Sequence, residues 1–286
     1  MAEILRMEAC LNGRRGRGEH PGLPVTPAEL ADSAAGAVAA GAEAVHLHPR
    51  DKGGSESLQA ADVGAAVAAV RAACPGVPVG VTTGLWAAAG DPDAREAAVT
   101  GWQALPAAAR PDFASVNVRE AGADVLPGLL ARAGIAAEAG VWTPADAALA
   151  ATIAPGTQWL RVMVEIPVDV PADGAVAAAD AVLRRLDDLG VTGPRLLHGE
   201  QDSCWPLIAH AGRLGLPARI GLEDVTAGPG GAPVAGNADL VRLALDVWSA
   251  AGQGSDVTRT HRDHAIPTPS ACSASRTTTR SSKATT

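Results

Sequence analysis

Short runs of apolar residues alternate along this chain with longer segments rich in alanine and leucine. The short runs carry the β-branched residues typical of buried strands, whereas the longer segments suit helices. The predicted strands cover residues 4–10, 44–48, 77–82, 113–118, 135–141, 159–165, 195–198 and 218–222. The pattern therefore predicts eight strands, each followed by a helical segment.

Start and stop signals support the helical segments. Residues 26–29 read Thr-Pro-Ala-Glu, with Pro at the first helical position and Glu at the third, and residues 143–146 repeat the pattern with Asp. Glycines stand where several helices should end, at the position that favours a left-handed backbone. These glycines are Gly41, Gly76, Gly134, Gly190 and Gly215.

The regular alternation predicts a (β/α)₈ barrel, which typically uses about 250 residues. An open, doubly wound sheet is the structural alternative. We expect residues 1–252 to form one barrel domain. Residues 253–286 are rich in Ser, Thr and Arg and show no apolar period, which predicts a disordered tail.

Composition and charge exclude several classes of function. The chain has 31 acidic and 23 basic residues, a net charge of −8, and only one Phe and no Tyr, which argues against nucleic acid as a partner. It contains no apolar stretch of membrane-spanning length, and charged residues in the first strand argue against a signal peptide. The four cysteines form no Cys-x-x-Cys pair. We therefore expect a cytoplasmic protein that does not bind membranes.

The second predicted strand ends with His46-Leu47-His48-Pro49-Arg50-Asp51. Residues two apart in a strand face the same way, so His46 and His48 should project together near the barrel mouth, where barrel enzymes have their active sites. Two neutral imidazoles on one face suit a divalent cation such as zinc. Hydrogen bonds to neighbouring strands are the alternative interpretation.

Zinc needs at least one more protein ligand, and the eighth strand offers one in Glu223 or Asp224. Strands two and eight both flank strand one in a closed barrel, so their ends lie about 10 Å apart. Adjacent residues cannot face the same way, so one acid should bind metal while the other acts as a base. The residues alone leave the assignment open.

Other strand ends carry further polar candidates. Structural hydrogen bonds and ion pairs are the alternative for each of them, and His198 is either a fourth ligand or a substrate contact. The candidates for catalysis or substrate binding are Arg14, Arg15, Thr82, Glu120, Glu138, Arg219 and His198.

The His-x-His-x-Arg-Asp block and the Arg-x-Gly-x-Glu-Asp block beginning at Arg219 together resemble the β-keto acid cleavage enzyme family. The resemblance implies a zinc-dependent barrel, a homo-oligomer, that converts a β-keto acid and acetyl-CoA into acetoacetate and a new acyl-CoA. It implies that His46, His48 and Glu223 bind the metal and that Asp224 removes a C2 proton. It also implies that Arg219 positions Asp224 and that Thr82 lies beside it.

The chain departs from the founding member of that family, which cleaves 3-keto-5-aminohexanoate. Arg14 and Arg15 stand where that enzyme has an acid that meets the ammonium group of its substrate, and Glu120 replaces a threonine. We therefore expect an anionic or neutral keto acid as substrate. A zinc hydrolase resembling amidohydrolases and a non-catalytic acyl-CoA or keto-acid binding barrel are the competing interpretations.

Overall fold

The computed structural model describes residue 4 and residues 6–153 and 159–260. Eight parallel strands close into a barrel in which each strand pairs with the next and β8 pairs with β1. The strands are β1 (Met7–Cys10), β2 (Ala44–Leu47), β3 (Val79–Thr82), β4 (Phe113–Asn117), β5 (Ala136–Val141), β6 (Val162–Ile166), β7 (Arg195–Gly199) and β8 (Ala218–Ile220). The predicted barrel is confirmed, and the open-sheet alternative is wrong.

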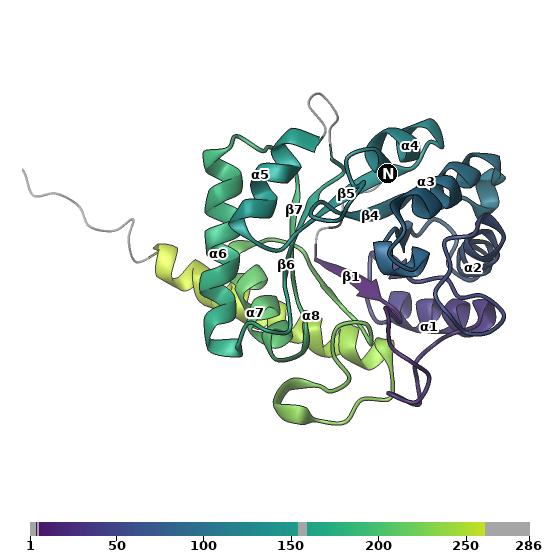
Figure 1. Ribbon diagram of the computed structural model, residues 1–286. Coiled ribbons are helices and arrows are strands. Elements are labelled where there is room, and N and C mark those ends of the chain that lie inside the picture. Colours follow the sequence, from purple (N-terminus) through teal and green to yellow (C-terminus); the bar gives the residue numbers. More distant parts are fainter. Residues whose placement is uncertain (1–3, 5, 154–158, 261–286) are drawn as a thin grey trace, which may run out of the picture.

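Helices surround the strands (Figure 1). The α-helices are α1 (Pro27–Ala39), α2 (Ala60–Ala73), α3 (Pro92–Gly101), α4 (Leu126–Arg132), α5 (Pro144–Ile153), α6 (Ala172–Asp188), α7 (Cys204–Leu214) and α8 (Asn237–Thr260). Short 3₁₀ turns lie in the connections: η1 (Leu85–Ala88), η2 (Trp102–Ala104), η3 (Ala107–Ala109), η4 (Gln201–Ser203) and η5 (Pro229–Gly231). None of the helices in the described part of the chain has the length and apolar character needed to cross a membrane.

The predicted helix starts are present as capping boxes. The Thr26 hydroxyl accepts a hydrogen bond from the Glu29 backbone N–H, and the Glu29 carboxylate accepts one from the Thr26 N–H. Thr143 and Asp146 make the same reciprocal pair at α5. The predicted stop glycines adopt positive φ angles, from 66° at Gly190 to 113° at Gly41, so local sequence determines where these helices begin and end.

The core lies partly between the barrel and its helices and partly inside the barrel. All strand residues except Ala136 and Arg195 are buried. One charged group is buried toward the amino ends of the strands, where the Arg161 guanidinium binds the carboxylates of Glu8 and Glu138 and lies 4.7 Å from the Phe113 ring centroid. We call Glu8, Glu138 and Arg161 the floor cluster.

The carboxyl-terminal helix contains the residue at which the barrel domain is expected to end. The boundary expected at residue 253 lies inside α8, which continues to Thr260. Helix α8 packs against both α7 and α1, so it closes the ring of helices next to the first one. Residues 261–286 of the expected tail lie outside the described residues.

Candidate active site

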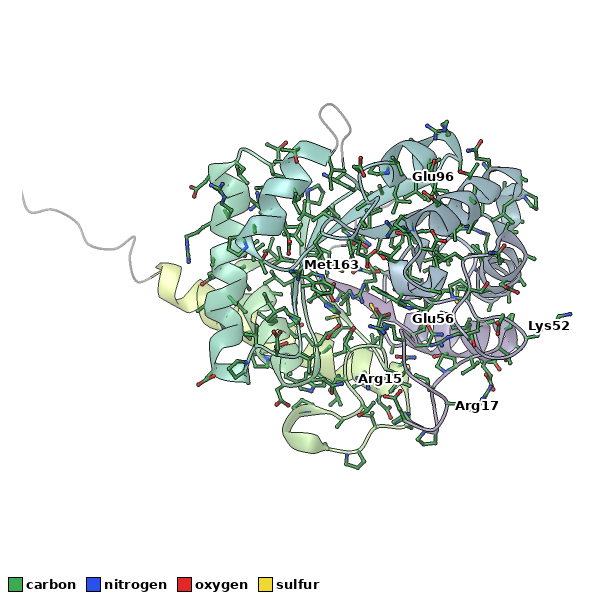
Figure 2. All side chains as sticks on the ribbon, in the orientation of Figure 1. Arg15, Arg17, Lys52, Glu56, Glu96 and Met163 are labelled. Atoms are coloured by element: carbon green, nitrogen blue, oxygen red, sulfur yellow. The ribbon has the colours of Figure 1, made fainter. Side chains whose placement is uncertain are left out.

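A cavity of about 340 Å³ lies where the strands end. Figure 2 shows Met163 near the middle of the barrel and Arg15 and Glu56 toward the side where β1 ends. The cavity wall includes Arg14, Arg15, His46, His48, Thr82, Trp86, Trp142, Met163, Glu165, Glu200, Arg219, Glu223 and Asp224. It therefore brings together eight of the residues predicted from sequence.

Two histidines and one carboxylate are close enough to share a cation. His48 Nε2 lies 3.4 Å from Glu223 Oε1, and His46 Nε2 lies 4.0 Å from Glu223 Oε2. Ligand atoms of all three residues lie within 4.8 Å of one another. Two imidazoles and a carboxylate are a donor set typical of catalytic zinc sites, and Glu223 Oε2 is buried without a hydrogen-bond partner in the described chain. The residues therefore fit a divalent cation.

A second set of potential ligands, Cys10, Glu223 and Asp224, shares Glu223 with the first. Burial raises the pKa of the Cys10 thiol well above its usual value. A thiol must lose its proton to bind zinc well. The histidine set therefore fits a cation better.

Hydrogen bonds fix both the backbone and the ring of His48. The Asn12 side chain exchanges two hydrogen bonds of 2.9 Å with the His48 backbone, which extends the pairing of β1 with β2 past the last strand residue. The Glu56 carboxylate binds His48 Nδ1 and also accepts a bond of 3.2 Å from the Trp86 indole. Glu56 thus directs Nε2 of His48 toward Glu223, as carboxylates do behind metal-binding histidines.

Two glycines allow Glu223 to reach the histidines. A Cβ atom on Gly221 would overlap the carbonyl oxygen of Cys10, so only glycine lets the end of β8 approach β1 this closely. Gly13 has a φ of 55°, and a Cβ atom there would overlap the Glu223 side chain. Steric overlap therefore explains why a glycine, Gly221, occupies the third position of the Arg-x-Gly-x-Glu-Asp block.

Arg219 and His198 both contact the two adjacent acids. The Arg219 Nη2 atom lies 2.6 Å from Glu223 Oε1 and 3.5 Å from Asp224 Oδ1. His198 Nε2 lies 2.7 Å from Asp224 Oδ1. Glu223 thus faces the histidine pair while Asp224 faces β7, which separates the two acids that the sequence left equivalent.

Burial and charge shift the pKa values of these groups in different directions. Burial lowers the pKa values of His46 and His198 well below their usual range, so both rings are neutral at neutral pH. Burial also acts on His48, but the neighbouring Glu223 and Glu56 carboxylates outweigh it and raise its pKa to about 9.

The two acids that follow β8 also differ. Burial raises the pKa of Asp224 well above its usual value. Glu223 is buried too, but Arg219 and the histidines outweigh that effect and hold its pKa well below the usual range. A carboxylate that stays ionised suits a metal ligand, and one with a raised pKa suits a base.

The wall that follows β6 and β7 is also acidic. Burial raises the pKa of Glu165 to about 8, and burial also raises the pKa of the neighbouring Glu200. Across the cavity, the Arg14 guanidinium lies 4.9 Å from the Trp86 ring centroid. Arg15 is paired with Glu19 at 2.9 Å. The cavity therefore presents arginines near the β1 loop and carboxyl groups with raised pKa values near β6 and β7.

Three predicted substrate contacts lie behind the cavity wall. Glu120 forms an ion pair with Arg95 and accepts a bond from the Leu85 N–H. Glu138 belongs to the floor cluster, where Arg161 holds it. His198 reaches the site through Asp224. Other protein groups already bind the carboxylates of Glu120 and Glu138 and the imidazole of His198. These contacts are the structural hydrogen bonds and ion pairs that were the alternative expected from the sequence.

Sequence reasoning missed Glu56 and Trp86. Glu56 lies in the loop after β2, and Trp86 lies in η1, where its ring stacks near His48 with centroids 6.3 Å apart. Neither residue stands at a strand end or in a periodic pattern. The only signal was that a metal-binding histidine requires a partner for its second ring nitrogen.

Solved structures with the same fold include complexes of a protein called ObcA. The binary complex of ObcA with oxaloacetate matches with a TM-score of 0.59 and 17% identity over 85% of this chain and 64% of that chain. The ternary complex of ObcA with a C4-CoA adduct and oxalate matches with a TM-score of 0.60 and 17% identity, covering 85% of this chain and 65% of that one. This chain therefore spans less than two thirds of the length of ObcA, and the likeness concerns the fold.

The sequence itself carries the stronger relationship. The model of the beta-keto acid cleavage enzyme family matches residues 5–260, which include every strand of the barrel and both motif blocks. The match confirms the resemblance drawn from those blocks. The chain belongs to the beta-keto acid cleavage enzyme family.

Proposed function

We propose that this protein is a zinc-dependent enzyme that converts a β-keto acid and acetyl-CoA into acetoacetate and a new acyl-CoA. The observation that carries the proposal is the arrangement after β8, where Glu223 faces His46 and His48 while Asp224 lies beside it in the same cavity. Membership of the family and the ObcA complexes with oxaloacetate and a CoA adduct support a keto acid and a CoA ester as substrates.

His46, His48 and Glu223 would hold the zinc ion. Zinc, when bound, supplies Lewis acidity that makes the C2 proton of a β-keto acid easier to remove. Glu56 keeps the His48 ring oriented, and Arg219 holds the Glu223 carboxylate in its ionised form. The protein thus orients the ligand set and supplies, in Arg219, the positive charge that balances the Glu223 carboxylate.

Asp224 acts as the general base. It takes a proton from C2 of the β-keto acid, and the electron pair left on C2 attacks the thioester carbonyl of acetyl-CoA, which releases CoA thiolate. The thiolate then attacks the original ketone carbon, and the bond from that carbon to C2 breaks. Acetoacetate leaves after Asp224 returns the proton to C2, and the remaining acyl group stays on CoA.

Arg14 is our candidate for the far end of the substrate, because Arg15 is already paired with Glu19. An anionic or neutral keto acid fits this basic side of the cavity. Faster cleavage of 3-keto-5-aminohexanoate than of neutral or anionic β-keto acids of equal length would contradict this assignment.

The test combines metal analysis with a product screen. Purified protein should contain about one zinc per chain and form acetoacetate and a new acyl-CoA from at least one member of a β-keto acid panel. Turnover should require acetyl-CoA. Hydrolysis without a CoA ester would favour an amidohydrolase-like enzyme, and binding of CoA esters without any turnover would favour a binding protein.

A further inference from the structure

His198 and Asp224 form a buried pair in which Asp224 lines the cavity and His198 lies behind it. His198 lies near the end of β7, which pairs with β8, and Asp224 follows β8 by four residues. Their side chains are 1% and 0% exposed, and His198 Nε2 lies 2.7 Å from Asp224 Oδ1. A pair this buried is held in one geometry by its surroundings.

The hydrogen bond and the ion pair that other side chains make with the Asp224 carboxylate converge on one of its oxygens. His198 Nε2 and Arg219 Nη2 both approach Oδ1, at 2.7 Å and 3.5 Å. The other oxygen, Oδ2, is buried and has no hydrogen-bond partner among the described residues. An unpartnered buried carboxylate oxygen costs free energy, so its retention needs a reason.

The protonation of His198 follows from the same contacts. Burial keeps the ring neutral by lowering its pKa well below the usual range. His198 Nδ1 is buried and has no partner in the described chain, so Nε2 makes the ring's contact with protein. When Asp224 is ionised it can only accept, so Nε2 must carry the hydrogen and donate it to Oδ1.

Thr82, for which the resemblance implies a place beside the base, is engaged elsewhere. Its hydroxyl accepts a hydrogen bond of 2.9 Å from the Gly84 backbone N–H, and this bond shapes the turn after β3. Thr82 lines the cavity with Asp224, but the neutral donor bound to the carboxylate is His198.

We propose that His198 is the positioning residue for Asp224: its Nε2–H group binds Oδ1 and leaves Oδ2 as the oxygen that receives the C2 proton of the substrate. The inference rests on the proposed function of Asp224 as the base. His198 acts through Asp224 and touches neither the substrate nor the metal.

The test compares two amides at the same position. In His198→Gln the side-chain nitrogen can take the place of Nε2, whereas in His198→Asn it is too short to do so. His210→Asn is the matched control, because His210 makes a similar bond of 2.7 Å to Asp180 on the helices outside the barrel. The measurements are zinc content, kcat, KM and exchange of the C2 hydrogens in deuterium oxide without acetyl-CoA.

We expect His198→Asn to lower kcat and the rate of C2 exchange about 10- to 100-fold, the range for losing a hydrogen bond to a charged group, with KM and zinc content unchanged. His198→Gln should recover most of this loss, and His210→Asn should match the wild type. Equal activity of the two His198 variants would overturn the inference, as would a change confined to KM, which would make His198 a substrate contact.

Failure of the proposed function has a different signature. In that case the wild-type protein itself would show neither acyl-CoA formation nor C2 exchange with any β-keto acid, and the role of His198 would fall with it. If the wild type is active and Asp224→Asn is not, the His198 variants decide the inference alone.

Discussion

The barrel encloses two clusters of buried charge that look alike in composition and differ in what surrounds them. The floor cluster is Glu8, Glu138 and Arg161, and the mouth cluster is His46, His48, Glu223, Arg219 and Asp224. In the floor cluster one guanidinium binds both carboxylates, and none of its members lines the cavity. Every member of the mouth cluster lines the cavity.

Burial of charge alone therefore does not identify a functional site. Both clusters contain carboxylate oxygens without a hydrogen-bond partner in the described chain. The mouth cluster adds ligand atoms that converge on one point and an open space beside them. We expect substitutions in the mouth cluster to change activity or metal binding, and those in the floor cluster to change stability.

The largest effect should follow Asp224→Asn. Because the amide cannot accept the C2 proton, we expect kcat to fall about 10²- to 10⁴-fold while zinc content stays at the wild-type level. Steady-state kinetics with metal analysis provides the measurement, and Asp246→Asn on the exposed face of α8 is the control. If the Asp224→Asn protein kept the wild-type kcat, Asp224 would not be the general base.

Arg161→Met should destabilise the protein by about 3–5 kcal/mol, because it leaves two buried carboxylates without their counter-charge. Denaturant unfolding measures the loss, and zinc content should be unaffected. The control is Arg242→Met, since Arg242 is 61% exposed in its pair with Asp239 and should contribute at most about 1 kcal/mol. If Arg161→Met lost zinc but kept its stability, the proposed separation of the two clusters would be wrong.

Glu56→Gln should weaken zinc binding about 10- to 100-fold, because the Glu56 carboxylate orients the His48 ring by binding Nδ1 and makes Nε2 a stronger metal ligand. Competition with a chromogenic chelator gives the affinity for zinc, and Glu96→Gln at an exposed position of α3 is the control. An unchanged affinity would show that Glu56 does not support His48 as a metal ligand.

The smallest effect should be a change in how the free energy of unfolding depends on pH when Glu8 of the floor cluster is replaced. Burial raises the pKa of Glu8 from 4.5 to about 7, so the folded protein binds a proton more tightly than the unfolded chain. The stability that this proton provides is complete below pH 4.5 and is lost as pH rises toward 7. Glu8→Gln cannot ionise, so its free energy of unfolding should change less with pH across this window. A slope equal to that of the wild type would show that Glu8 is not the titrating group.

Local sequence was sufficient for the elements and for one half of the site. The alternating apolar runs, the Thr-Pro starts and the stop glycines act over a few residues, and the corresponding strands, caps and positive φ angles are all present. His46 lies in β2 and His48 directly follows it, and their ring centroids are 5.3 Å apart, as the two-residue repeat of an extended backbone predicts.

Glu138 and His198 show where that reasoning stopped. Both were predicted as substrate contacts from their place near strand ends, yet Arg161 holds Glu138 and Asp224 holds His198. Their partners lie 23 and 26 residues away in sequence, on neighbouring strands or just beyond them. Strand periodicity says which way a side chain faces and leaves open what it meets there.

Strand and helix periodicity predicted the barrel, and the motifs predicted the pair of histidines and the two adjacent acids after the eighth strand. The placement of the two acids depends on the fold, because Glu223 meets His46 and His48 while Asp224 meets His198. Closure of the barrel places β8 between β1 and β7, and Gly221 lets the end of β8 approach β1. The physical reason is that the surroundings of a side chain depend on contacts between segments far apart in the sequence, which no local pattern encodes.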